Sequence, residues 1–163
     1  MKTELAVLLI GIGATATMDA WSLLRKIVLG VPPTNWRLVG RWIAYLPRGR
    51  FYHPGIAATP SVAGEVGVGW GVHYAIGIGY AGLLIALYGS AWLRNPTIGP
   101  ALIVGFATVA APFLIMQPGM GAGIAGSRTP NPAATRLHSL MNHGIFGAGL
   151  YATAWLLKAL GLI

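Results

Sequence analysis

Three ionisable side chains stand inside long apolar runs of the sequence. Asp19 lies in the apolar run near the N-terminus, His73 in a run in the middle of the chain, and His143 in the last one. Ionisable groups within a membrane span are costly and are commonly functional. A carboxylate and two imidazoles can exchange protons near neutral pH, and they are also a ligand set for zinc or iron. The pattern predicts an intramembrane polar site.

These three residues are predicted to lie at one depth. Asp19 precedes Arg25, which closes its apolar run, by six residues, and each histidine lies six residues into its own run. Six helical residues correspond to about 9 Å, so the three side chains are expected at similar height. Gln117 falls near the same level and is included in the predicted site. The alternative interpretation is a buried polar cluster that only holds the helices together.

The surroundings of the two histidines repeat. His73 is followed by Gly77 and His143 by Gly147, and the two segments are related by a constant offset of about 70 residues. Such a repeat predicts a duplicated helical hairpin, as found in many transport proteins. The repeated histidines would also suit the axial ligands of a b-type haem.

The composition indicates that lipid surrounds these elements. Of the 163 residues 55% are hydrophobic and 9% are charged, whereas a soluble domain carries roughly 25% charged residues. Eleven Lys and Arg outnumber three acidic residues and stand between the apolar runs, which is typical of membrane proteins and not of nucleic-acid binders. Cysteine is absent, which excludes disulfides and thiolate chemistry.

Four apolar segments are long enough to cross a bilayer, which takes about 20 helical residues. We expect these spans at residues 5–24, 67–89, 98–116 and 137–160. The sequence therefore predicts an all-α membrane protein in which residues 1–163 form a single domain, a four-transmembrane-helix bundle. Because four helices are few for alternating access, a homo-oligomer is also expected.

The distribution of Lys and Arg predicts the orientation. Most of them fall in the first and third connections between spans, and cytoplasmic loops carry the excess of basic residues. Both of these loops are therefore expected in the cytoplasm, with both termini outside.

Residues 35–46 of the first cytoplasmic loop are predicted to form an amphipathic helix, capped by Thr34 and ended by Pro47. Its apolar residues, two tryptophans among them, share one face, while Arg37 and Arg41 fall on the other. This pattern is typical of a helix that lies in the membrane interface.

The cytoplasmic arginines are predicted to contact anionic lipid headgroups or an anionic ligand. These residues are Arg37, Arg41, Arg48, Arg50, Arg128 and Arg136. Residues 117–132 are rich in Gly and Pro but lack the Lys-Ser/Thr pair of a phosphate-binding loop, so a tightly packed or re-entrant turn is favoured. His53 is interpreted as a loop residue and His138 as an interfacial one.

Several motifs resemble a known family. They include Thr17-Met-Asp-Ala-Trp-Ser22, Leu46-Pro-Arg-Gly-Arg-Phe51, His73-Tyr-Ala-Ile-Gly77 and Met116-Gln-Pro-Gly-Met-Gly-Ala-Gly123. With these motifs the chain resembles, over nearly its whole length, a family of small bacterial inner-membrane proteins catalogued only as a domain of unknown function. The resemblance implies a multi-pass location in the bacterial inner (cytoplasmic) membrane. It implies no enzyme activity, cofactor or substrate.

Several functions remain open. The favoured hypothesis is a small transporter or channel for a small solute, ion or proton that uses the Asp19, His73 and His143 layer. The second is a protein in which the same residues hold a transition metal or a b-type haem. The third is a membrane enzyme that acts on a lipid headgroup, with His as general base and Arg on phosphate, and the last is a structural or accessory role. Anionic membrane lipids are the expected partners.

Overall fold

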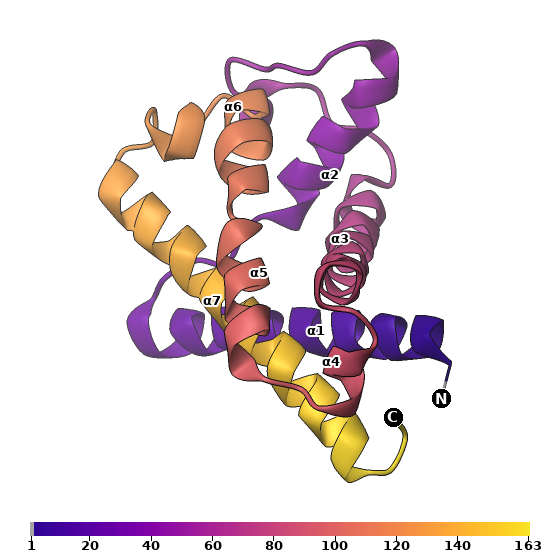
Figure 1. Cartoon of the computed structure of the whole chain (residues 1–163). Helices are drawn as coiled ribbons and strands as arrows, with labels where there is room; N and C mark the ends of the chain where they lie inside the picture. Colours follow the sequence, from indigo (N-terminus) through magenta and orange to yellow (C-terminus); the bar gives the residue numbers. More distant parts are fainter. Residues whose placement is uncertain (1) are drawn as a thin grey trace. The chain divides into compact units, whose positions relative to one another are not determined.

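The computed structural model describes residues 2–163, and across these residues the chain is helical, without a strand. Three long helices, α1 (Thr3–Leu29), α3 (Glu65–Tyr88) and α7 (Pro132–Ala159), alternate with shorter ones (Figure 1). The shorter elements are α2 (Trp36–Tyr45), α4 (Ala91–Arg94), α5 (Ile98–Ala107), α6 (Gln117–Gly119) and the 3₁₀ turns Leu46–Arg48, Ile56–Ala58 and Ile124–Gly126. The predicted all-α class is confirmed.

Three segments of the described chain are long and apolar enough to cross a membrane. They are α1, α3 and the stretch Ile98–Gly119. The predicted fourth span falls on α7, which has 28 residues but includes the polar Asn142 and His143 and is not among the three. The membrane class is supported, and the count of four spans remains a prediction.

The third predicted span, 98–116, is not one regular α-helix. α5 ends at Ala107, and the chain continues through a turn into a π-helical segment, Pro112–Met116, before α6. Proline has no N–H and its ring crowds the carbonyl four residues earlier, and π-helical widening is one way in which a helix absorbs such a defect. The hydropathy of 98–116 gave no sign of this break.

The predicted interfacial helix 35–46 corresponds to α2. Its N-cap is Asn35, whose side-chain oxygen accepts a hydrogen bond from the backbone N–H of Leu38 at 3.4 Å, so the prediction of Thr34 as the cap was wrong. The α-helix ends at Tyr45 and is followed by the 3₁₀ turn that contains Pro47. The bounds were therefore predicted to within a residue.

The chain divides into two compact units. Unit 1 comprises the chain up to Pro33 together with Tyr74–Thr108 and Met141–Ile163, and unit 2 comprises Thr34–His73 and Val109–Leu140. Helices α3 and α7 contribute residues to both units.

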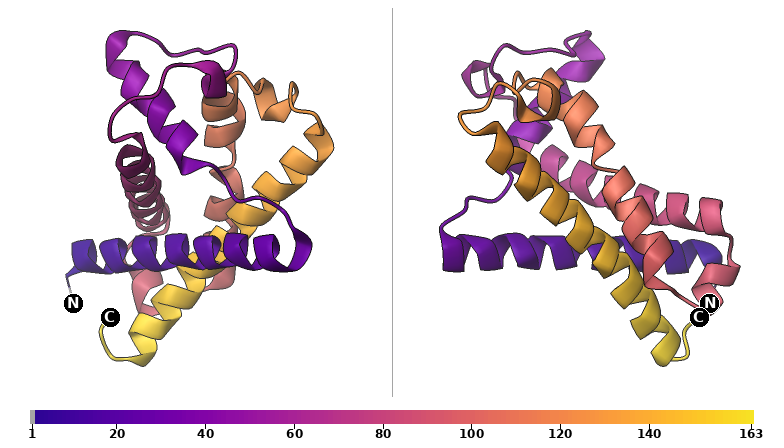
Figure 2. Two further views of the ribbon diagram at one scale, coloured as in Figure 1. Left: turned by 180° about the vertical axis from the view of Figure 1, so that it is seen from behind. Right: turned by 60° about the vertical axis from the view of Figure 1, so that its left-hand side comes forward.

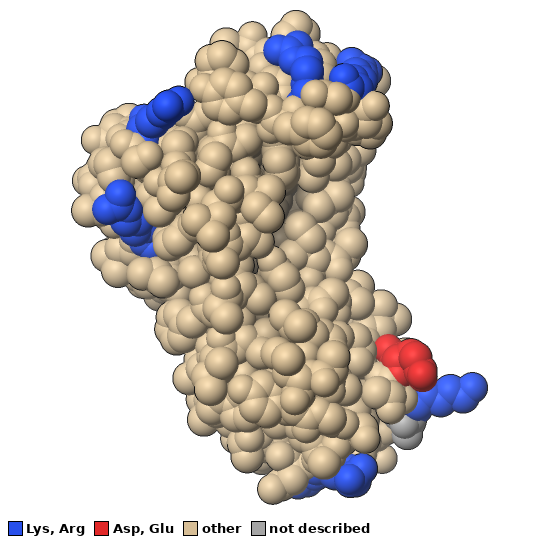
Figure 3. Space-filling model, turned by 45° about the horizontal axis from the view of Figure 1, so that its top comes forward, with Lys and Arg blue, Asp and Glu red and all other residues tan. Residues whose placement is uncertain are grey.

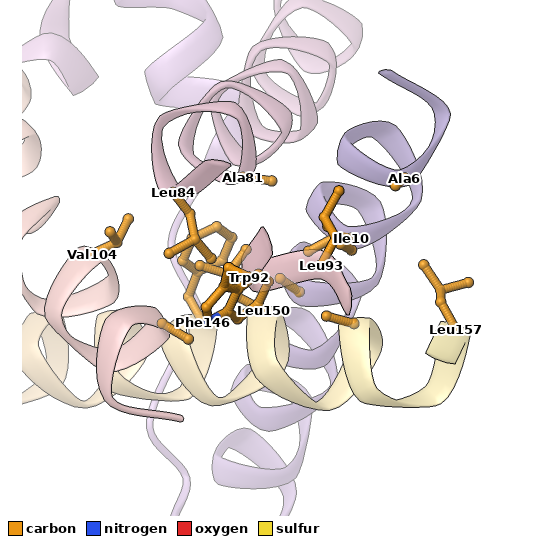
Figure 4. Packing of buried hydrophobic residues seen from close by; sticks show 13 residues of the cluster. Ala6, Ile10, Ala81, Leu84, Trp92, Leu93, Val104, Phe146, Leu150 and Leu157 are labelled. Atoms are coloured by element: carbon orange, nitrogen blue, oxygen red, sulfur yellow. The ribbon is translucent and has the colours of Figure 1, made fainter. Parts of the chain in front are cut away.

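An apolar core holds unit 1 together (Figure 4). Ile10 of α1, Leu84 of α3 and Leu150 of α7 are at most 1% exposed. Trp92 of α4 and Phe146 of α7 lie in the same cluster, and the labelled side chains in Figure 4 point toward one another from separate helices. Burial of these side chains fixes how the helices of unit 1 pack.

Small residues set the helix crossings of unit 1. Gly77 of α3 lies against Thr15 of α1, and Gly147 of α7 lies against α5 so closely that a Cβ on Gly105 would be 2.7 Å from the Gly147 Cα. Small residues allow such close approach between helices in lipid. The glycine of each predicted repeat therefore marks a helix crossing.

Neighbouring helices of unit 1 run antiparallel. Gly11 lies against Ile78 and Val7 against Gly82, so residue numbers fall along α3 as they rise along α1. The same order relates α1 to α7, where Ala14 packs on Gly149 and Gly13 on Thr153. The beginning of α1 and the C-terminal end of the chain consequently lie near each other in both views of Figure 2.

Much of the surface is apolar. The side chain of Ile27 is 73% exposed and that of Val28 is 65% exposed. On the face drawn in Figure 3, the charged side chains are few and widely separated. Soluble monomers rarely expose such broad apolar surfaces. The surface is that of a protein in contact with lipid.

Candidate functional site

His143 is anchored at the end of α5, within unit 1. Its Nδ1 lies 3.1 Å from Thr108 Oγ1 and 3.3 Å from the carbonyl oxygen of Gly105. Thr108 Oγ1 donates its hydrogen to that same carbonyl at 2.8 Å. Because both neighbours of Nδ1 then act as acceptors, Nδ1 carries the proton of the neutral ring. The second ring nitrogen, Nε2, is left as a proton acceptor or ligand atom.

Asp19 is paired with a tyrosine of another helix in the same unit. The Tyr74 hydroxyl of α3 donates to Asp19 Oδ2 at 3.1 Å. A carboxylate within an apolar span requires such a partner. The hydrogen bond thus gives the Asp19 carboxylate a polar partner on α3.

His73 lies in an aromatic setting within unit 2. Its ring stacks on Trp36 of α2 with the centroids 3.8 Å apart, and Trp70 approaches it edge-on at 5.7 Å. His73 is only 5% exposed. Trp36, which belongs to the helix predicted to lie in the membrane interface, thus packs on a candidate site residue.

The convergence of the three predicted residues on one site remains a prediction, because Asp19 and His143 belong to unit 1 and His73 to unit 2. Across residues 2–163 no group of three or more His, Cys, Asp or Glu side chains is arranged to hold a metal ion. The metal and haem hypotheses thus gain no support. Gln117, the fourth predicted residue, donates from Nε2 to Ser139 Oγ at 3.3 Å within unit 2.

A buried ion pair joins α2 to the start of α3. The Glu65 carboxylate is 4% exposed and accepts hydrogen bonds from Arg41 Nε at 2.8 Å, from Arg41 Nη2 at 2.9 Å and from Arg37 Nε. It also accepts the backbone N–H of Val62 at 3.0 Å. These hydrogen bonds raise the pKa of Arg41 above its usual range. Two of the six predicted anion-binding arginines therefore already contact a carboxylate of the chain.

The other four predicted arginines are exposed on unit 2. The guanidinium groups of Arg48 and Arg50 lie 5.0 and 5.1 Å from the ring centre of Tyr45, a cation–π arrangement. Arg128 and Arg136 each donate one hydrogen bond within the unit. Contact of these four arginines with an anionic surface stays a prediction.

The Gly- and Pro-rich loop 117–132 is a packed turn, as favoured from its sequence. The carbonyl of Gly119 accepts the backbone N–H of His53 at 2.8 Å, and that of Met120 accepts Ile56 N–H at 3.2 Å. Gly121 adopts a φ of +93°, and a Cβ there would lie 2.6 Å from the carbonyl of His53. The loop's glycines admit a second chain segment rather than a phosphate.

His53, interpreted from the sequence as a loop residue, does lie in a loop, but it is buried. Its side chain is 0% exposed, and its Nδ1 lies 3.0 Å from Thr59 Oγ1. Its Nε2 is buried without a hydrogen-bond partner among the described residues. Burial, and to a lesser extent the charge of Arg50, lowers the pKa of His53. No periodic pattern marks this position, so the sequence carried no signal for its burial.

Arg25 was read from the sequence only as the residue that closes the first span. It is 3% exposed, and its Nε and Nη1 are buried without a partner among residues 2–163. Trp21, one helical turn earlier on α1, likewise has a buried and unpartnered Nε1. The guanidinium carbon lies 5.9 Å from the Trp21 ring centre. The spacing of four residues between them was a signal that sequence reasoning did not use.

The comparisons with known proteins identify the family. The model described as "Protein of unknown function (DUF2938)" matches residues 8–157. Because this match covers most of the chain, the protein belongs to that family, as its motifs predicted. Neither the search of curated proteins nor that of solved structures gives a match.

Proposed function

We propose that this member of the DUF2938 family is a four-span protein of the bacterial inner membrane, a small transporter or channel that conducts protons and also takes a small solute. The observation that carries the proposal is His143, whose Nδ1 proton is held by Thr108 and Gly105 at the end of α5. With that nitrogen fixed, proton uptake and release occur at Nε2.

The irregular backbone after α5 supports a transport role. Non-helical backbone at membrane depth is tolerated where it is buried in protein or lines a cavity, and transporters place their sites beside discontinuous helices. The stretch Ile98–Gly119 is apolar enough to span yet includes a turn and a π-helical segment. Its one break lies next to the only histidine of unit 1 within the described chain.

The pairing of Asp19 with Tyr74 supplies a second polar group on α1 and α3. In transport proteins, carboxylate and histidine groups within spans serve as proton relays. We assign Asp19 to the same proton path as His143, and we extend that path to His73, the residue that the repeat relates to His143.

The helix directions support four crossings. Within unit 1, α1 runs antiparallel to both α3 and α7, and the two ends of the chain lie on one side (Figure 2). An even number of crossings returns a chain to its starting side. The duplication is supported by Gly77 and Gly147, since Gly77 packs against α1 and Gly147 packs against α5. A homo-oligomer is part of the proposal.

The proton path is tested in proteoliposomes that contain a pH-sensitive dye. Wild-type protein is expected to dissipate an imposed pH gradient, and His143→Gln is expected to slow this by about tenfold or more. His138→Gln, five residues earlier on the same helix, is the matched control and should retain the wild-type rate. Wild-type liposomes that leak no faster than empty ones, or equal rates in both variants, would refute the proposal.

The orientation is tested separately by thiol labelling. Cysteines at Lys2 and Ile163 are expected to react with an impermeant reagent in intact spheroplasts, and a cysteine at Arg50 is expected to be protected. In this orientation the exposed Arg48 and Arg50 face the anionic cytoplasmic leaflet. Labelling at Arg50 alone would invert the arrangement.

A further inference from the structure

We propose that Trp21 and Arg25 of α1 form a binding site for an anion that presents a carboxylate or phosphate group. The site goes beyond the proposed proton path, because His143, Thr108 and Gly105 need no anion in order to hold a proton. It deepens the proposed function by giving the solute a chemical class.

The first observation is a set of buried donors without acceptors. Arg25 is 97% buried, and two of its guanidinium nitrogens, Nε and Nη1, have no hydrogen-bond partner in the described chain. The indole Nε1 of Trp21 is also buried and has no hydrogen-bond partner in the described chain. Buried N–H groups are nearly always satisfied in folded proteins, and a buried charge requires a counter-ion.

The second observation is that, among residues 2–163, the ion pairs join Arg37 and Arg41 to Glu65, and none joins Arg25 to a carboxylate. The sequence contains three acidic residues. Glu65 is engaged by Arg41 and Arg37, and Asp19 accepts from Tyr74. Glu4 lies 21 residues before Arg25 on the same helix, about 31 Å away along its axis. We therefore assign the acceptor of these N–H groups to a bound anion from outside the chain.

The geometry selects the ligand class. Residues four apart lie on one face of a helix, so the two side chains share one side of α1, with the guanidinium carbon 5.9 Å from the Trp21 ring centre. The guanidinium group binds carboxylate and phosphate oxygens through charge-assisted hydrogen bonds. A buried site of this kind favours an anion over a neutral solute because the charge of Arg25 is otherwise uncompensated.

The neighbouring Lys26 supplies a matched control. It carries the same charge as Arg25 one residue later, but its side chain is exposed. A general attraction of anions to this end of α1 would depend on both residues equally. A built site depends on Arg25 and on the Trp21 N–H, and not on Lys26.

The test measures anion binding to purified, delipidated wild-type protein in neutral detergent. Inorganic phosphate and acetate are titrated as free anions. In a second arm the protein is placed in nanodiscs, and phosphatidylglycerol is compared with phosphatidylcholine. Binding of a free anion assigns the site to a solute, and binding of phosphatidylglycerol alone assigns it to a lipid headgroup.

Arg25→Gln is expected to weaken binding by about tenfold or more, since a hydrogen bond to a charged group contributes roughly that factor. Trp21→Phe replaces the indole by a phenyl ring, which has no N–H group, and should weaken anion binding less than Arg25→Gln does. Lys26→Gln should leave the affinity for the anion within about twofold of wild type. Absence of binding by every probe, or equal losses for Arg25→Gln and Lys26→Gln, would overturn the proposal.

A second measurement keeps the test valid if Arg25→Gln folds poorly. Arg25→Met removes the uncompensated charge while retaining side-chain length, so it should raise the unfolding temperature of anion-free protein and abolish the stabilisation by added anion. A lower unfolding temperature for Arg25→Met without anion would contradict an empty anion site. His143→Gln should bind anion like wild type, so failure of the proton path and failure of this site are distinguishable.

Discussion

Gly40 of α2 and Gly69 of α3 face each other within unit 2, where the two helices cross at backbone contact. A Cβ built on Gly40 would lie 2.6 Å from the backbone nitrogen of Gly69, and closer still to the carbonyl oxygen of Glu65. Ordinary van der Waals contact begins at 3.4 Å. Gly40→Ala must therefore push α2 away from α3 by about 0.8 Å or more, because the obstructing atoms are backbone and cannot rotate aside.

This displacement has two costs. Overpacking of a tight contact lowers the free energy of unfolding by about 1–3 kcal/mol. Because the obstructing atoms belong to the backbone, we expect Gly40→Ala to lose about 3 kcal/mol, the upper end of this range. The shift also moves Arg41, the next residue, away from the carboxylate of Glu65, to which it donates at 2.8 and 2.9 Å. For a chain of this length 1 kcal/mol corresponds to about 2–4 °C, so the unfolding temperature should fall by about 6–12 °C.

The assay is thermal unfolding in detergent, followed by tryptophan fluorescence. Gly71→Ala is the control: Gly71 lies on α3, two residues after Gly69, and nothing in the described chain stands within 4 Å of its Cβ position. Because alanine stabilises a helix over glycine by about 0.5–1 kcal/mol, Gly71→Ala should raise the unfolding temperature by about 1–4 °C. If Gly40→Ala is as stable as Gly71→Ala, the two helices do not cross at Gly40.

Two further predictions concern the charged and buried groups of unit 2. Glu65→Gln leaves Arg41 buried without its counter-ion and should lower the unfolding temperature by about 6 °C or more. Glu4→Gln, on the exposed start of α1, is the control and should change the unfolding temperature little. Equal effects of the two substitutions would show that the ion pair contributes nothing to stability. Because the folded chain lowers the pKa of His53, the unfolded chain binds a proton first as the pH falls below about 6.5. The contribution of His53 to the free energy of unfolding is therefore constant above about pH 6.5. Below that pH it declines by at most about 1.4 kcal/mol per pH unit. When wild type and His53→Gln are compared across this range, the wild type should lose more stability toward acid.

The class of fold and the positions of its long helices were predictable. Apolar runs of about 20 residues predict spans because lipid offers the backbone no hydrogen bonds, and three of the four predicted segments meet that description in the structure. The amphipathic period of residues 35–46 gave α2 to within a residue, since Pro47 and the turn residues before Trp36 delimit it. Its cap was misassigned because Thr34 and Asn35 are both good N-caps.

The partners of individual side chains were not predictable. Helix α3 contains six glycines. Gly69 and Gly77 lie at helix crossings, whereas Gly67, Gly71 and Gly79 have no described atom within 4 Å of a Cβ position. Which face of an apolar helix meets a neighbour depends on crossing geometry, and a helix that is apolar all round gives no preferred face. For the same reason hydropathy did not show the π-helical segment after α5.

The sequence by itself determined that this is a basic, cysteine-free, helical membrane protein, because composition and the lengths of apolar runs select lipid as the solvent. Its motifs also determined the family, and they flagged Asp19, His73 and His143 as ionisable residues in apolar surroundings. Only the tertiary structure decided that Arg41 is neutralised by Glu65, that His53 is buried, and that Arg25 has no acceptor in the described chain. Hydrogen-bond partners far apart in sequence depend on how helices pack, and a charge count cannot show which arginine is left without a carboxylate.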